Sequence, residues 1–193
     1  MIRLFVGLGN PGRRYERNRH NLGFLVCDEL AAQQDISWSE KKKSLSGFFF
    51  FESHKVWLLK PTTYMNLSGE AIRPFIQKKG ILAEEVMVIH DEVALPLGQI
   101  RLKPQGGTAG HNGIESVIRC LGTDVFYRLR LGVNQAPPGI KLADYVLANF
   151  MLEEETIAAA MVKEAAQACL QVLHDGEAKA MSLLNARQPS PKD

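Results

Sequence analysis

The chain has 193 residues and a formal net charge of +2, which does not by itself indicate a nucleic-acid partner. Its length suits one domain with a substantial core. No apolar stretch approaches the roughly 18 residues of a membrane span, and Arg3 interrupts the apolar run that a signal peptide would need. The three cysteines lie far apart without a C-x-x-C pair, which argues against a disulfide framework and predicts a cytoplasmic protein.

The first half of the chain predicts a strand, a helix, a hairpin and a second helix, over residues 2–6, 22–34, 46–52 with 55–60, and 67–79. The first strand is almost wholly apolar, as is typical of a central strand that is buried on both faces. Ser53 and His54 form the predicted turn of the hairpin. The second helix ends in two lysines and Gly80, a common helix stop, and Pro74 inside it predicts a kink or a late start.

The second half predicts two strands, a helix, a third strand and two helices, over residues 85–89, 99–103, 113–121, 126–133, 153–174 and 175–184. Asn112 and Glu115 resemble a capping box for the first of these helices, which ends at Gly122. We expect residues 188–193 to be disordered. Strands and helices alternate but include a hairpin. Residues 1–187 are therefore predicted to form a single α/β domain, a mixed twisted β-sheet flanked by helices on both faces.

Residues 7–23, GLGNPGRRYERNRHNLG, allow two interpretations. The glycines in the first six positions match the G-x-G-x-x-G turn that binds the pyrophosphate of NAD or FAD. Such a turn opens directly into a helix, whereas the polar run at residues 13–19 has no apolar stripe of helical period. An oxidoreductase that uses a dinucleotide is therefore the weaker alternative, and a lack of NAD or FAD binding would exclude it. The other interpretation depends on His20, near the end of the segment.

Several standard catalytic motifs are missing from the sequence. It has no G-x-S-x-G, H-E-x-x-H or P-loop motif, so we expect no metal, no cofactor and no covalent nucleophile. What remains is His20, near a predicted helix start, and Asp91, directly after a buried strand at the sheet edge where open α/β sheets bind ligands. A neutral imidazole takes a proton from water near pH 7, and a carboxylate orients it. The pair suits hydrolysis by activated water, although each residue alone has an ordinary structural explanation.

Three asparagines stand at the ends of predicted loops: Asn10 precedes a proline, and Asn66 and Asn112 each precede a helix. Amide side chains hold a carbonyl substrate and stabilise an oxyanion without competing for the proton. The ordinary explanation of each asparagine alone is a turn residue or a helix N-cap.

Basic side chains form three clusters along the chain. One precedes the first helix, one is a lysine run and one lies on two predicted strands: Arg13, Arg14, Arg17 and Arg19; Lys41–Lys43; and Arg101, Lys103, Arg128 and Arg130. The ordinary explanation of any one cluster is a solvated surface. If several clusters converge on one face, they form a footprint for the phosphates of a nucleic acid.

Taken together, four segments closely resemble the signatures of the bacterial peptidyl-tRNA hydrolase family: GLGNPGRRYERNRHNLGF, KPTTYMNLSGEA, VIHDEVALPLG and GGTAGHNGIESVI. They occur in the expected order, and the strand RLRLGV and the chain length also fit. The resemblance implies cleavage of the ester between a peptide and the terminal ribose of tRNA, which recycles tRNA dropped from stalled ribosomes. It implies peptidyl-tRNA as partner, through its acceptor stem and its peptide, and no stable protein partner. We expect a monomer because no seam of heptads occurs.

The resemblance also implies a role for each polar residue of the four segments. His20 would be the general base and Asp91 its orienting partner. Asn10 would position His20 and the substrate near the scissile ester. Asn66 and Asn112 would hold peptide backbone or water and help to stabilise the oxyanion.

Four further residues match positions of the family's substrate contacts. Met65 would shape the peptide cleft and Tyr15 would line the site, while Lys103 and Arg130 would clamp the terminal phosphate of the tRNA. The sequence departs from the usual pattern at a few positions near the site, namely Asn18, Ala94, Pro104, Gln105 and Asn134. An RNA-binding module without catalysis, which also occurs on this fold, is the second alternative, and the intact catalytic set argues against it.

Overall fold

The computed structural model describes residues 1–186, whose strands form one seven-stranded sheet in the order β2-β3-β4-β1-β5-β7-β6. The strands are β1 (Leu4–Gly7), β2 (Ser39–Lys41), β3 (Ser44–Phe51), β4 (His54–Pro61), β5 (Val86–Glu92), β6 (Ile100–Lys103) and β7 (Tyr127–Gly132). β4, β1, β5 and β7 run parallel, whereas β3 and β6 run antiparallel to their neighbours. The predicted mixed sheet is confirmed.

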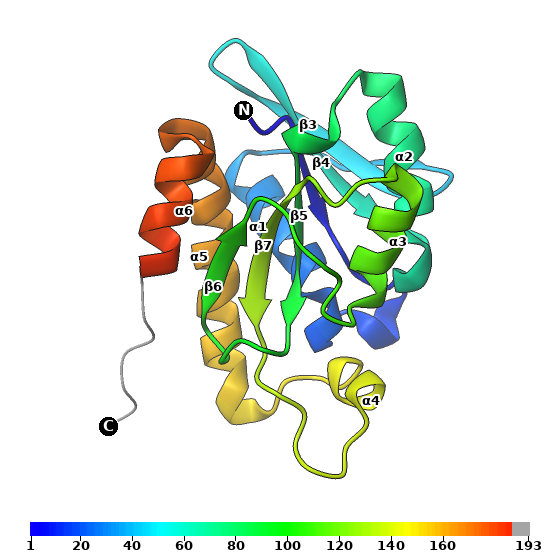
Figure 1. Cartoon of the computed structure of the whole chain (residues 1–193), viewed down its shortest axis with the longest axis vertical. Helices are drawn as coiled ribbons and strands as arrows, with labels where there is room; N and C mark the ends of the chain where they lie inside the picture. The colour runs from blue at the N-terminus through cyan, green and yellow to red at the C-terminus, as the bar shows by residue number, and fades with distance from the viewer. Residues whose placement is uncertain (187–193) are drawn as a thin grey trace.

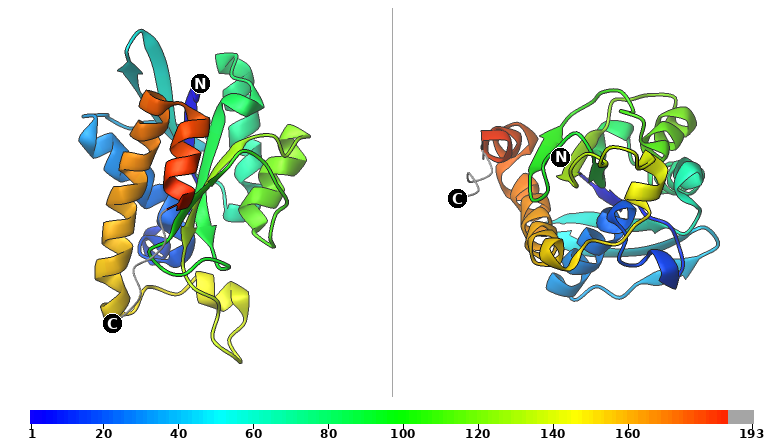
Figure 2. Two further views of the ribbon diagram at one scale, coloured as in Figure 1. Left: turned by 60° about the vertical axis from the view of Figure 1, so that its left-hand side comes forward. Right: turned by 90° about the horizontal axis from the view of Figure 1, so that it is seen from below.

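Helices cover both faces of the sheet, as predicted (Figure 1, Figure 2). On one face lie α1 (Leu22–Gln33), α5 (Leu152–Asp175) and α6 (Glu177–Ala186), and on the other lie α2 (Ser68–Lys79) and α3 (Asn112–Leu121). The short α4 (Leu142–Val146) lies beyond the carboxyl ends of β5 and β7, at the bottom of Figure 1. Of the helices in this part of the chain, none combines the length and apolar character needed to cross a bilayer.

The central strands contribute to two apolar cores because successive side chains of a strand point to opposite faces. Phe5 packs in the core under α1, α5 and α6, whereas its neighbours Leu4 and Val6 pack in the core under α2 and α3. β5 divides in the same way, with Met87 in the first core and Val88 in the second. A strand buried on both faces is apolar at nearly every position, which is why β1 and β5 were recognisable as unbroken apolar runs.

The structure corrects several predicted boundaries. The hairpin turns at Glu52 and Ser53, one residue earlier than predicted, and Glu52 adopts a positive φ of 52°. α2 begins at Ser68 and continues through Pro74 without interruption. β2 and α4 were not predicted, because β2 is three exposed polar residues and α4 is a single short turn of helix. Residues 188–193 lie outside the described residues, so the prediction for them stays a prediction.

The segment at residues 7–23 folds in a way that explains its glycines. A Cβ on Gly7 would lie 2.1 Å from the carbonyl oxygen of Gly23, and one on Gly9 would lie 2.6 Å from the ring of Phe24. The glycines therefore allow the end of β1 to pack closely against α1. The polar run predicted as a loop contains two short 3-10 helices, η1 (Arg13–Tyr15) and η2 (Arg19–Asn21).

Two further 3-10 helices, η3 (Met65–Leu67) and η4 (Ala83–Glu85), precede α2 and β5. Asn134, one of the departures from the family pattern, has a positive φ of 65°. Asparagine tolerates this conformation better than most residues. Its side-chain oxygen also accepts a hydrogen bond from the backbone N–H of Leu97 at 2.9 Å. The substitution is therefore compatible with the turn.

Candidate active site

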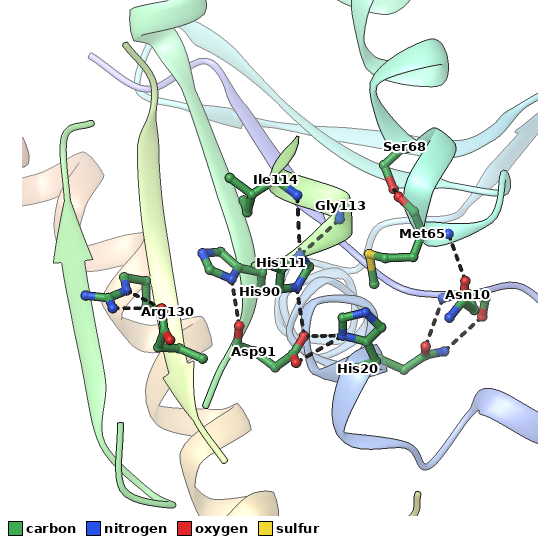
Figure 3. Close-up of polar contacts among 12 residues, drawn as sticks. Asn10, His20, Met65, Ser68, His90, Asp91, His111, Gly113, Ile114 and Arg130 are labelled. Atoms are coloured by element: carbon green, nitrogen blue, oxygen red, sulfur yellow. Dashed lines mark hydrogen bonds and ion pairs between the residues drawn. The ribbon is translucent and has the colours of Figure 1, made fainter. Parts of the chain in front are cut away.

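The two residues predicted to act together, His20 and Asp91, meet at the carboxyl ends of the central strands. His20 lies on η2, just before α1 begins, and Asp91 is the penultimate residue of β5. Although 71 positions separate them in the chain, Nδ1 of His20 lies 2.8 Å from Oδ1 and 3.0 Å from Oδ2 of Asp91. Both side chains are buried, and Figure 3 shows them pointing toward one another.

The carboxyl group of Asp91 is a buried anion with two histidine neighbours. Burial raises the pKa of a carboxyl group, but here the interactions with His20 and His111 outweigh burial and hold the pKa of Asp91 well below its usual range. Nε2 of His111 lies 3.0 Å from Oδ1 of Asp91. Asp91 therefore stays ionised at every pH at which an enzyme ordinarily works. An acid limb in a rate profile would report a group other than this carboxyl.

Asn10 follows β1 and is fixed through both its main chain and its side chain. Its backbone N–H donates to Oδ1 of Asn21 at 2.8 Å, and Nδ2 of Asn21 donates to the carbonyl of Asn10 at 3.0 Å. Its Oδ1 accepts from the backbone N–H of Met65 at 2.8 Å. Because a backbone N–H can only donate, this contact identifies the oxygen of the Asn10 amide. The Nδ2 donors have no protein partner within residues 1–186.

Two clefts open on either side of His20. A cleft of about 300 Å³ brings together the other predicted catalytic and peptide-binding residues, namely Asn10, Tyr15, Met65, Asn66 and Asn112. A second cleft, of about 240 Å³, is lined by His20, Asp91, His111 and Asn112. Ala143 and Val146 of α4 line both clefts. The shared residues make His20 the point at which the two clefts meet.

Neither Asn66 nor Asn112 caps a helix, so the ordinary explanation of these asparagines fails. Asn66 lies within η3 and is exposed. The predicted capping box at Asn112 is wrong, because the N-cap of α3 is His111, whose ring accepts from two backbone N–H groups. Asn112 is therefore the first residue of α3, and its exposed side chain faces a cleft instead of the helix end.

His20, Asp91 and His111 are the residues of the described chain that could ligate a metal ion, since their donor atoms all lie within 4.8 Å of one another. Both histidines, however, contact the carboxylate at 2.8 to 3.0 Å, the length of a charge-assisted hydrogen bond. A cation would have to displace the protons of these hydrogen bonds. The donor set thus fits a proton-transfer site better than a metal centre.

Comparison with known proteins identifies the family. The model of the peptidyl-tRNA hydrolase family matches residues 4–192 of this chain. A peptidyl-tRNA hydrolase of Gloeobacter violaceus is 46% identical over 100% of this chain and 98% of that protein. One of Bacillus anthracis is 45% identical over 96% of this chain and 100% of that protein.

The chain belongs to the peptidyl-tRNA hydrolase family.

Solved structures of the peptidyl-tRNA hydrolase family share the fold. The crystal structure of the enzyme from Acinetobacter baumannii has a TM-score of 0.91 and 34% identity, covering 98% of this chain and 97% of that chain. A 5'-methylthioadenosine nucleosidase from Arabidopsis thaliana, only 8% identical over 96% of both chains with a TM-score of 0.52, resembles it in fold alone. Family membership makes the chain a hydrolase and excludes the interpretation as a dinucleotide-dependent oxidoreductase.

The peptidyl-tRNA hydrolase fold buries two members of the predicted basic clusters, Arg19 and Arg128. Arg19 pairs with Glu154 and donates to the carbonyl of Asn149, while its guanidinium stacks on the rings of Tyr145 and Phe150. These contacts hold η2, which carries His20, against the segment between α4 and α5. Arg19 therefore has a structural role here, whereas the other arginines of its cluster are exposed.

Three of the four members of the third basic cluster lie together, whereas Arg101 donates to the carbonyl of Asn185 instead. Lys103, Arg128 and Arg130, from the adjacent strands β6 and β7, line a small pocket of about 160 Å³. Arg130 donates through Nε and Nη2 to Oε2 of Glu92, at 2.9 and 2.7 Å. Its charge is thus largely compensated, whereas Lys103 is exposed and, within residues 1–186, forms no ion pair. Glu92 also lines the second cleft, so the basic pocket adjoins the site.

Sequence reasoning missed two members of this site. His111 contacts Asp91 directly, and Glu92 compensates Arg130. The signal for His111 was its position immediately before a predicted helix start, where a side chain that accepts hydrogen bonds is expected. The signal for Glu92 was its place beside Asp91 at the end of a buried strand.

Proposed function

We propose that this chain hydrolyses the ester between a peptide and the terminal ribose of tRNA, with water activated by His20 and without a covalent intermediate. The observation that carries this proposal is the contact between Nδ1 of His20 and the carboxylate of Asp91, where two clefts meet. An ionised carboxylate requires the proton of the ring at Nδ1. The lone pair then resides on Nε2, which has no protein partner within residues 1–186 and is free to accept a proton.

In the proposed reaction, Nε2 of His20 first accepts a proton and then returns it. Water attacks the ester carbonyl carbon while its proton passes to Nε2 of His20, and the charge of Asp91 stabilises the imidazolium that forms. As the tetrahedral intermediate collapses, the bond between the carbonyl carbon and the ribose oxygen breaks, and the imidazolium returns the proton to that oxygen. The products are tRNA with a free ribose hydroxyl and a peptide carboxylic acid, which loses its remaining proton to solvent and leaves as the carboxylate.

Asparagine side chains stabilise the negative charge of the intermediate. The oxygen of the Asn10 amide is occupied by the backbone of Met65, which leaves its Nδ2 donors for the substrate. Asn66 and Asn112 line the same cleft and offer further amide donors to the oxyanion or to the peptide backbone. Met65 is buried beside them and, with Tyr15, shapes the wall of the peptide cleft.

A turnover experiment in ¹⁸O-labelled water tests the proposal. Attack of water on the acyl carbon places one labelled oxygen in the peptide carboxylate and none in the ribose hydroxyl of the released tRNA. Mass spectra of the quenched enzyme should contain no acyl adduct. Binding of peptidyl-tRNA without cleavage would favour the catalytically silent RNA-binding module, and an acyl adduct formed at a competent rate would contradict direct attack by water.

Substrate affinity is expected to weaken as salt concentration rises, because Lys103 and Arg130 would hold a phosphate of the acceptor stem in the basic pocket. Lys103→Ala should reduce the slope of log Kd against log salt by about 1, the change expected for the loss of one phosphate contact. Lys163→Ala, at an exposed position on α5, serves as the matched control. A binding constant that does not change between 50 and 200 mM KCl would argue against the phosphate contact.

A further inference from the structure

Both ring nitrogens of His111 are engaged by fixed partners. Nδ1 accepts from the backbone N–H groups of Gly113 and Ile114, at 3.1 and 3.3 Å, and so caps the N-terminus of α3. Nε2 lies 3.0 Å from Oδ1 of Asp91. Figure 3 shows the ring of His111 between these two sets of partners. Two further titratable rings pack against it, those of His20 and of His90 on β5, with centroids 4.7 and 4.8 Å from that of His111.

These partners determine the protonation of the ring. A backbone N–H can only donate, so Nδ1 must carry a lone pair, and the single hydrogen of the neutral ring is on Nε2. A second proton on Nδ1 would face two N–H groups and the positive end of the helix dipole. The N-terminus of α3 thus fixes the tautomer of the neutral ring, in which Nε2–H is the donor to the carboxylate of Asp91.

Oδ1 of Asp91 consequently accepts two hydrogen bonds, one from His111 and one from His20 at 2.8 Å. We propose that His111 is a positioning residue for the base, one that holds the carboxylate of Asp91 in place and limits its attraction for the proton of His20. This inference rests on the proposed role of His20. The N-terminus of α3 would thus act on His20 through the side chains of His111 and Asp91.

The proposal predicts the direction in which the acid limb of kcat/KM moves when His111 is replaced. A carboxylate oxygen that donates part of its electron density to His111 stabilises the imidazolium form of His20 less than a free carboxylate would. Loss of the donor at residue 111 should therefore leave His20 protonated to higher pH. The acid limb of kcat/KM would move upward, and activity would fall more at pH 6 than at pH 8.5.

Two substitutions of His111 distinguish its hydrogen bond to Asp91 from its capping of α3. The side-chain oxygen of asparagine can occupy the position of Nδ1, so His111→Asn keeps the cap and loses the donor to Asp91. The side-chain nitrogen of glutamine can occupy the position of Nε2, so His111→Gln keeps the donor and loses the cap. His54→Ala, at an exposed histidine on β4, serves as the control.

The experiment measures kcat/KM against pH and the thermal midpoint for both variants with peptidyl-tRNA. His111→Asn should move the acid limb upward by about half a unit to one unit, which lowers kcat/KM at pH 6 about 3- to 10-fold, while its thermal midpoint stays near the native value. His111→Gln should show the reverse, with a lower thermal midpoint and a native acid limb. Equal acid limbs in the two variants, whether native or shifted, would overturn the proposal. If His20→Ala retained full activity, the proposed function would fail instead.

Discussion

Replacing His20 by alanine is expected to eliminate measurable turnover while the fold persists. Loss of a general base costs about 10²- to 10⁴-fold in rate. Among residues 1–186, no other side chain offers a free imidazole nitrogen to both clefts. Within residues 1–186, His20 contributes a hydrogen bond to Asp91 but none to any other residue. Asp91 keeps its contact with His111, so the carboxylate is not left without a partner.

Two measurements check this result. The release of free tRNA from peptidyl-tRNA gives kcat/KM, and circular dichroism with thermal unfolding confirms that the variant is folded. His54→Ala removes an exposed histidine at the start of β4 and should behave like the native chain. A folded His20→Ala variant that hydrolyses peptidyl-tRNA at the native rate would show that the assigned base is wrong.

Asp91→Asn is expected to lower kcat/KM less than His20→Ala, because it removes the charge that stabilises the imidazolium but not the base itself. The structure gives a reason for the smaller loss. His111 donates to the Oδ1 position, so the amide oxygen of the replacement should occupy that position. That oxygen can still accept from Nδ1 of His20, which preserves the productive tautomer of the base.

The loss of a negative charge should also move the acid limb of kcat/KM to lower pH. Asp35→Asn is the matched control, since Asp35 is exposed and its positive φ of 50° suits asparagine. A loss from Asp91→Asn equal to or larger than that from His20→Ala would point to a different proton acceptor.

The fold could be predicted where one strong local pattern dictated it. β1 and β5 were recognisable because burial on both faces demands apolar residues at consecutive positions. The ends of α2 and α3 were recognisable because Gly80 and Gly122 stop them in the left-handed conformation, as the structure confirms. β2 and α4 carry too few residues for any periodicity, and β2 is an exposed polar segment that pairs with the adjacent β3.

The site could be predicted in part for a similar reason. Asp91 stands at the carboxyl end of a parallel strand, where topology requires ligands to bind, and the family resemblance supplied the pairing with His20. The hydrogen-bond partners could not be predicted from the sequence, since they depend on side-chain orientation. The role of His111 was missed because Asn112, a more conventional capping residue, was predicted to cap the helix. Arg19 was grouped with exposed arginines because its aromatic partners lie about 130 positions away.

The measurement that tests the central claim most directly compares two titrations. The midpoint of the acid limb of kcat/KM with peptidyl-tRNA should coincide with the titration midpoint of His20, followed by NMR of histidine-labelled enzyme. Both midpoints should move together, to lower pH, in Asp91→Asn. An acid limb that stays in place while the His20 titration moves would show that another group takes the proton from water.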